Sequence, residues 1–177
     1  MSMRLIHRTA ASSSRDIDEC LTGLLFSELL SPGRRLILVS PWMSDFPVLD
    51  NRGGRFTAVD PAWTAGRVQF SAVLRALLAR GVLIKIACGE GDREDDFLDR
   101  VRLGARLDGT ADRLVTFRPP RDHRVFSHEK ALIADSWAVY GSMNLTYSGV
   151  TINGELITVT TDPSAVGTVA MQMGQFF

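Results

Sequence analysis

The sequence has little of several features that would each define a class of protein. It holds two cysteines, Cys20 and Cys88, with neither CxxC spacing nor the density of a disulfide-stapled fold, so we expect two reduced thiols in the core. No apolar run approaches the ~20 residues of a membrane-spanning helix, and residues 1–16 lack the apolar segment of a secretory signal. These absences predict a cytoplasmic protein without membrane insertion.

An excess of charge of one sign is also missing. The 20 basic residues balance the 20 acidic ones, so no overall field attracts nucleic acid or a membrane surface. The basic set holds 18 arginines but only two lysines, Lys85 and Lys130, so a lysine beside other reactive groups is informative. The acidic stretch 90–99 could form a metal loop, but carboxylates also favour the start of a helix. We expect no metal and no cofactor, since no cluster has metal-ligand spacing.

The hydrophobic pattern predicts the fold class. With 177 residues, 45% of them hydrophobic, the chain has the size of a single domain over 1–177. We expect an α/β fold with a mixed, mostly parallel sheet flanked by helices. The expected helices cover 15–30 (with Ser14 as its cap), 68–80, 97–107 and the segment from 163 or 164 onward; the expected strands cover 35–39, 82–88, 114–117, 130–134, 138–140 and 155–160.

Two connections in this pattern bear on topology and function. The strand, loop, helix and strand between residues 35 and 88 imply a parallel pair with a right-handed crossover. Within it, residues 41–67 are rich in proline, glycine, aspartate and tryptophan and predict a long loop. Loops of that length usually carry function or are disordered.

The segment 127–155 gathers groups that suit phosphoryl chemistry. His128 and Lys130 alternate along a predicted strand, so both point to one side of it. If the next strand pairs beside this one, Ser142 and Asn144 project onto the same spot. A nucleophile, a cation and neutral donors are what a phosphoryl group needs. A carboxylate such as Glu155 against the far imidazole nitrogen would set the tautomer.

These residues form a recognisable motif: His128-x-Lys130-x4-Asp135, then Gly-Ser-x-Asn over 141–144, then Glu155. The pattern resembles the HKD motif of the phospholipase D superfamily, which implies a phospholipase D-like fold. The resemblance implies that His128 is the nucleophile, that Lys130 and Asn144 bind the phosphate, and that Ser142 supports them. It further implies that Glu155 orients the histidine and that Asp135 is mainly structural.

The chain carries one such motif, and neither His7 nor His123 is followed by a lysine at the right spacing. It therefore resembles the short single-motif nucleases of the superfamily, which complete the site across a homodimer. The segment LVSPWMSDFPVLDNRGGRF (38–56) is similar to phospholipase-D-like proteins of bacterial DNA 7-deazaguanine modification and restriction clusters. These resemblances imply a metal-independent phosphodiesterase, a DNA endonuclease that works through a phosphohistidine, with possible partners in a defence or modification complex.

Candidate substrate contacts lie outside the motif. A basic cluster precedes the motif: Arg118, Arg121, His123 and Arg124. This cluster either forms a solvated turn or contacts the phosphates of a nucleic-acid backbone. Arg52 and Arg55 are further candidates for such phosphate contacts. Trp42, together with Trp63 and Phe46, could stack on bases or pack into the core. Two other functions stay open. One is hydrolysis of a phospholipid or another phosphodiester, and the other is a non-cleaving nucleic-acid-binding subunit of a larger complex.

Overall fold

A computed structural model describes residues 2–118 and 128–177 and is built on a seven-stranded sheet. A buried run of apolar residues forms the centre of the sheet, where both faces are covered. In spatial order the strands are β1 (Met3–Arg8), β9 (Glu155–Thr160), β8 (Ala138–Gly141), β7 (Ala131–Ile133), β2 (Arg35–Ser40), β5 (Leu83–Cys88) and β6 (Leu114–Phe117).

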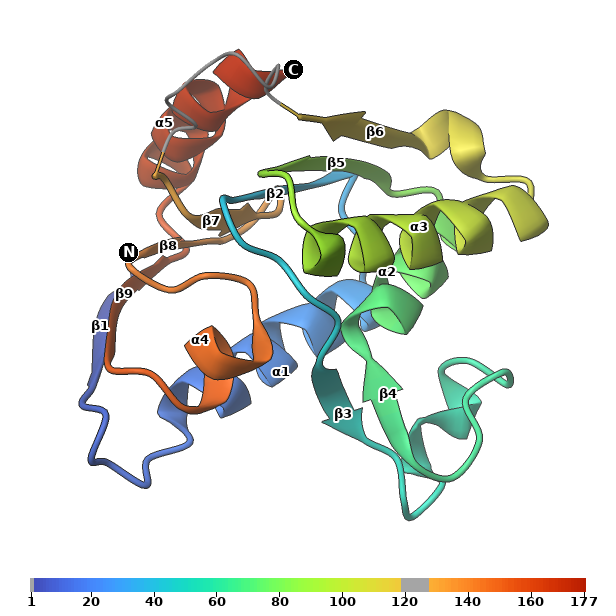
Figure 1. The fold of residues 1–177 in the computed structure, drawn as a ribbon, viewed down its shortest axis with the longest axis horizontal. Helices are drawn as coiled ribbons and strands as arrows, with labels where there is room; N and C mark the ends of the chain where they lie inside the picture. Colours follow the sequence, from blue (N-terminus) through green and yellow to red (C-terminus); the bar gives the residue numbers. More distant parts are fainter. Residues whose placement is uncertain (1, 119–127) are drawn as a thin grey trace.

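Helices cover both faces of the sheet (Figure 1). Helices α1 (Asp16–Leu30), α2 (Phe70–Ala79) and α3 (Asp92–Leu107) lie on one face, and α5 (Pro163–Met173) lies on the other. Successive residues of β2 alternate between the two layers: Leu36 and Leu38 belong to the larger core, and Ile37 and Val39 pack in the layer of α5. A short helix, α4 (Tyr147–Thr151), follows β8.

The expected α/β class is confirmed, but the expectation of a mostly parallel sheet is wrong. Only the β2–β5 and β5–β6 pairs are parallel, and the pairs β1–β9, β9–β8, β8–β7 and β7–β2 are antiparallel. The parallel pair predicted across 35–88 is therefore present. Strands β7 and β8 are joined by residues 134–137 alone, and so short a connection allows only an antiparallel pair.

Outside residues 41–67, the sequence pattern located most of the strands and α-helices but missed β1 and α4. Strand β1 presents one face to solvent and so lacks a continuous apolar run, and α4 is too short to show a helical period. Helix α3 begins earlier than expected, at Asp92, because the acidic stretch forms its first turn. Ser14 does not cap α1 as expected; its hydroxyl accepts from the Asp16 N–H, and Arg15 is the N-cap residue.

The predicted loop 41–67 contains ordered structure. It holds β3 (Pro47–Asp50), a 3-10 turn (Arg55–Ala58) and the first residue of β4 (Arg67–Gln69), and β3 and β4 form a separate two-stranded sheet. The buried Asn51 side chain donates to the carbonyls of Trp63 and Thr64 and accepts from the Phe56 N–H. One buried carboxamide thus joins three parts of the segment and holds them in a defined structure. The loop-like composition of 41–67 did not predict this structure.

Both cysteines are free thiols, with Cys88 buried and Cys20 half-buried. Burial raises the pKa of the Cys88 thiol to about 11, so this sulfur is a poor nucleophile. None of the helices in the described residues is both long enough and apolar enough to cross a membrane. A single domain over 1–177 and a cytoplasmic location stay predictions.

Candidate active site

The sheet topology brings the motif residues to one end of the sheet. In the antiparallel pairs, Ala131 at the start of β7 lies opposite Tyr140 near the end of β8 and opposite Val39 near the end of β2. The end of β8 in turn lies beside the start of β9. Four segments therefore meet at one end of the sheet: the end of β2, the segment before β7, the end of β8 and the start of β9. The motif residues lie on these segments, as expected if neighbouring strands present them to one spot.

His128 and Lys130 are in direct contact, as expected from their spacing. Lys130 Nζ lies 2.8 Å from His128 Nδ1 and donates to the His128 carbonyl at 2.5 Å. An ammonium has no acceptor capacity, so a protonated Lys130 makes Nδ1 the acceptor in this contact. His128 itself is exposed, whereas Lys130 is buried. Burial lowers the pKa of Lys130, and the negative charge of Glu155 opposes that shift.

Ser142 and Glu155 form a second contact. The Ser142 hydroxyl donates to Glu155 Oε2 and accepts from the Leu156 N–H at 3.0 Å. Gly141 makes this approach possible: its φ is +149°, and an added Cβ would lie 2.3 Å from the Leu156 carbonyl oxygen. Among the described residues no hydrogen bond joins Glu155 to the His128 ring, so the expected orienting contact is not present in this arrangement.

Asn144 reaches the site from the loop after β8, where its partner is Ser40. Ser40, at the end of β2, is fully buried. Its Oγ lies 3.3 Å from Asn144 Oδ1 and 2.8 Å from the Trp42 carbonyl oxygen. The same Oγ accepts a hydrogen bond from the Leu145 N–H. Ser40 has one hydroxyl proton and both carbonyl groups compete for it, while the Nδ2 donors of Asn144 have no partner among the described residues and can serve a ligand. The sequence analysis missed Ser40, although a polar residue that ends an apolar strand was a signal.

Of the three aromatic candidates in 41–67, the structure brings only Trp42 to the site. Its ring lies edge-on to the His128 ring, with centroids 5.7 Å apart, and its side chain is 53% exposed. Trp63 and Phe46 are buried in the core, which confirms core packing as the alternative to base stacking for these two residues. An exposed indole beside the imidazole is available for stacking on a substrate.

Two predicted site residues lie elsewhere. Asp135 follows β7, at the other end of the strand from His128; it accepts from the Arg34 backbone N–H at 2.7 Å and forms ion pairs with Arg34 and Arg35. It joins the β7–β8 turn to the start of β2, and the mainly structural role that the resemblance implies stays a prediction. Arg118 follows β6 and forms an ion pair with Asp95. Arg121, His123 and Arg124 lie outside the described residues.

The site has one cation, Lys130, and the part of the chain that the structure describes holds no cluster of metal ligands. Within residues 2–118 and 128–177, no group of three or more His, Cys, Asp or Glu side chains could hold a metal ion. The Lys130 ammonium and the Asn144 amide provide positive charge and neutral donors, whereas the Ser142 hydroxyl donates its proton to Glu155. This set is suited to the non-bridging oxygens of a phosphodiester.

The architecture described above is that of the phospholipase D-like proteins. Residues 62–177 match the family described as "Cardiolipin synthase, PLD-like domain", and the chain belongs to this family of the phospholipase D superfamily. No curated protein sequence matches the chain.

Solved structures support the same fold. Nuc from Salmonella typhimurium, a phospholipase D family member, is 15% identical with a TM-score of 0.57, and the match covers 99% of this chain and 93% of Nuc. NucT from Helicobacter pylori is 13% identical with a TM-score of 0.59, over 99% of this chain and 96% of NucT. Phosphatidylserine synthase from Haemophilus influenzae Rd KW20 is 15% identical with a TM-score of 0.64, over 98% of this chain but 38% of that one.

Proposed function

We propose that this protein is a metal-independent phosphodiesterase that cleaves DNA as an endonuclease. The observation that carries the proposal is the direct contact of His128 Nδ1 with Lys130 Nζ at an exposed edge of the sheet. This contact leaves Nε2 as the ring nitrogen available to a ligand. A protein that only binds a ligand does not need a nucleophile held beside a fixed cation.

The reaction takes two displacements. A deprotonated Nε2 of His128 attacks phosphorus, the bond from phosphorus to the leaving oxygen breaks, and a second histidine gives that oxygen a proton. Lys130 and Asn144 bind the non-bridging oxygens of the phosphohistidine. The second histidine then takes a proton from water, whose oxygen attacks phosphorus and releases His128. No metal enters the sequence of steps.

The second histidine comes from a second copy of the chain in this proposal. In the described residues the only other histidine is His7, which lies on the exposed face of β1. A twofold homodimer that places two His128 side chains at one phosphate is the simplest arrangement that supplies both roles. The nucleophile is the neutral His128 tautomer that keeps its proton on Nδ1 and has the lone pair on Nε2, and the acid is the doubly protonated imidazolium of the second histidine.

DNA is the favoured substrate, and a role in DNA modification, restriction or defence follows from the resemblance of residues 38–56. Trp42 supports a substrate with bases, since its exposed ring stands beside the nucleophile. Phospholipid hydrolysis is the second candidate, because the matching family is described as a cardiolipin synthase domain. A non-cleaving subunit of a nucleic-acid complex is the third.

The decisive experiment compares wild-type protein with His128→Ala, using His7→Ala as the matched histidine control. Both DNA and phospholipid vesicles are incubated with each protein in excess EDTA, and the protein is analysed by mass spectrometry for a phosphorylated histidine. We expect DNA cleavage by wild type and His7→Ala only. Cleavage of lipid alone would move the assignment to the second candidate, and activity that needs added magnesium would exclude the mechanism.

A further inference from the structure

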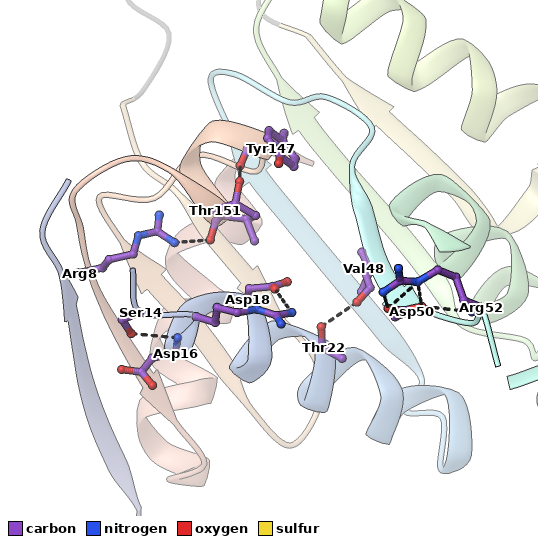
Figure 2. A network of polar contacts seen from close by, with 12 residues as sticks. Arg8, Ser14, Asp16, Asp18, Thr22, Val48, Asp50, Arg52, Tyr147 and Thr151 are labelled. Carbon is purple, nitrogen blue, oxygen red and sulfur yellow. Dashed lines mark hydrogen bonds and ion pairs between the residues drawn. The ribbon is translucent and has the colours of Figure 1, made fainter. Parts of the chain in front are cut away.

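A polar cavity lies beside α4, the helix that follows Asn144. Its volume is about 310 Å³, and it lies between β1, the start of α1, β3 and α4. Figure 2 shows groups from these elements facing one another across it. Arginines outnumber carboxylates in its lining by four to two; the arginines are Arg8, Arg15, Arg52 and Arg67, and the carboxylates are Asp18 and Asp50.

The two carboxylates are already engaged, and Arg15 and Arg52 keep donors free. Arg15 contacts Asp18 through Nη2 alone, at 3.0 Å. Arg52 contacts Asp50 through its backbone N–H, Nε and Nη2, so its Nη1 is unused. A guanidinium has five N–H donors, and both side chains therefore retain some for a ligand. The pKa of Asp50 is held well below its usual range by these hydrogen bonds, so the carboxylate stays ionised and paired.

Arg67 adds further positive charge, which acts on Asp50 across the β3–β4 pair. Its side chain is exposed and makes no hydrogen bond or ion pair with residues 2–118 or 128–177. It stands opposite Asp50 in the β3–β4 pair, where Arg52 already occupies that carboxylate. A third guanidinium beside the Asp50–Arg52 ion pair adds positive charge that favours an anion in the cavity.

Helix α4 connects the cavity to the catalytic residues. Tyr147 and Thr151 of α4 line the cavity, and Tyr147 comes three residues after Asn144, so their Cα atoms are at most about 11 Å apart. The fully buried Arg8 fixes the α4 side of the cavity, since it donates hydrogen bonds to the carbonyls of Gly149, Val150 and Asn153. Arg8 also lies opposite Glu155 in the β1–β9 pair. The cavity and the site thus share one firmly held segment.

We propose that this cavity is a second phosphate subsite, which binds a backbone phosphate of the same nucleic-acid strand whose scissile phosphate lies at His128. This proposal rests on the proposed function and narrows it to polymeric phosphodiesters. Arginine forks match phosphate oxygens in geometry, and a strand carries further phosphates on each side of the one that is cleaved. A small diester with one phosphate cannot occupy both places.

The test compares a long oligonucleotide with bis(p-nitrophenyl) phosphate, a diester that reaches only the catalytic site. Arg67→Gln should lower kcat/KM for the oligonucleotide on the order of tenfold, the size expected for one charge-assisted contact, and leave the small diester unchanged. Arg106→Gln is the matched control, since Arg106 is also exposed but lies in the last turn of α3. The salt dependence of oligonucleotide binding should fall by roughly one counterion in Arg67→Gln.

The possible failures can be told apart. Equal loss on both substrates, or no loss on either, would overturn the subsite while leaving the catalytic proposal intact. Wild-type protein that cleaves neither substrate would remove the proposed function. The subsite is then judged by binding of the oligonucleotide alone: weaker binding by Arg67→Gln than by Arg106→Gln supports it, and equal binding overturns it.

Discussion

The two ends of strand β7 carry parts of the same motif and are built differently. At the end with His128, side chains remain available to a ligand: the imidazole and the Trp42 ring are exposed. At the end with Asp135, the carboxylate is occupied by Arg34 and Arg35. The motif is contiguous in the sequence, but its two parts lie apart because a strand places its termini at opposite ends of the sheet. One part carries the proposed reactive groups, and the other forms ion pairs.

The largest effect is expected at the His128 end. His128→Ala should reduce turnover by on the order of 10⁴-fold or more, because no neighbouring side chain replaces the nucleophile. The exposed ring contributes little to packing, so thermal unfolding should be nearly unchanged. Rates measured with DNA, together with a melting curve of each protein, test both statements. A variant that retains near-wild-type rates would contradict the assignment of the nucleophile.

Removal of the groups that hold the phosphate should have the next largest effect. Asn144→Ala and Lys130→Met should each lower kcat by about 10²–10³-fold, through loss of one contact to the transition state. The pH profile offers a sharper test. Because burial lowers the pKa of Lys130, the ammonium loses its proton at a lower pH than an ordinary lysine does, and activity should fall on the alkaline side below pH 10.5.

Lys130→Arg is the control for that profile, since a guanidinium stays protonated throughout the accessible range. Its residual activity should not show the alkaline fall. If wild type and Lys130→Arg lose activity at the same pH, the titrating group is not Lys130.

A smaller effect is expected at Ser40, which acts through Asn144. Ser40→Ala should lower kcat by about tenfold and reduce stability by about 1–3 kcal/mol, because the buried Leu145 N–H loses its acceptor. In an Asn144→Ala background the same change should have no further effect on kcat. Ser44→Ala is the matched control, since its hydroxyl accepts only a long 3.4 Å contact from Tyr147. Additive losses in the double variant would refute this positioning role.

The smallest effect on chemistry is expected at the opposite end of the strand. Asp135→Asn should leave kcat per folded molecule unchanged and reduce the free energy of unfolding by about 1 kcal/mol, since its arginine partners are exposed and water screens the ion pairs. Urea unfolding and active-site titration measure the two quantities separately. A large loss of kcat with unchanged stability would return Asp135 to the catalytic set.

Sequence reasoning predicted well wherever the signal was local. The bounds of β6 and β9 were predicted to the residue, and those of α1 within one residue, because each is an apolar run or a 3–4 period bounded by clear breakers. The contact of His128 with Lys130 followed in the same way from their spacing along one segment. Local patterns failed for β1 and for residues 41–67, where order comes from partners distant in the chain.

The sequence by itself determined the motif, the α/β class and the identity of the reactive groups, since these depend on residue type and short-range periodicity. Only the tertiary structure decided that Ser40 contacts Asn144, 104 residues away, that Glu155 bonds Ser142, and that arginines from β1, α1 and the β3–β4 region surround one cavity. Such contacts depend on which strands are neighbours and in which register. That choice is made by packing across the whole sheet, and no local pattern encodes it.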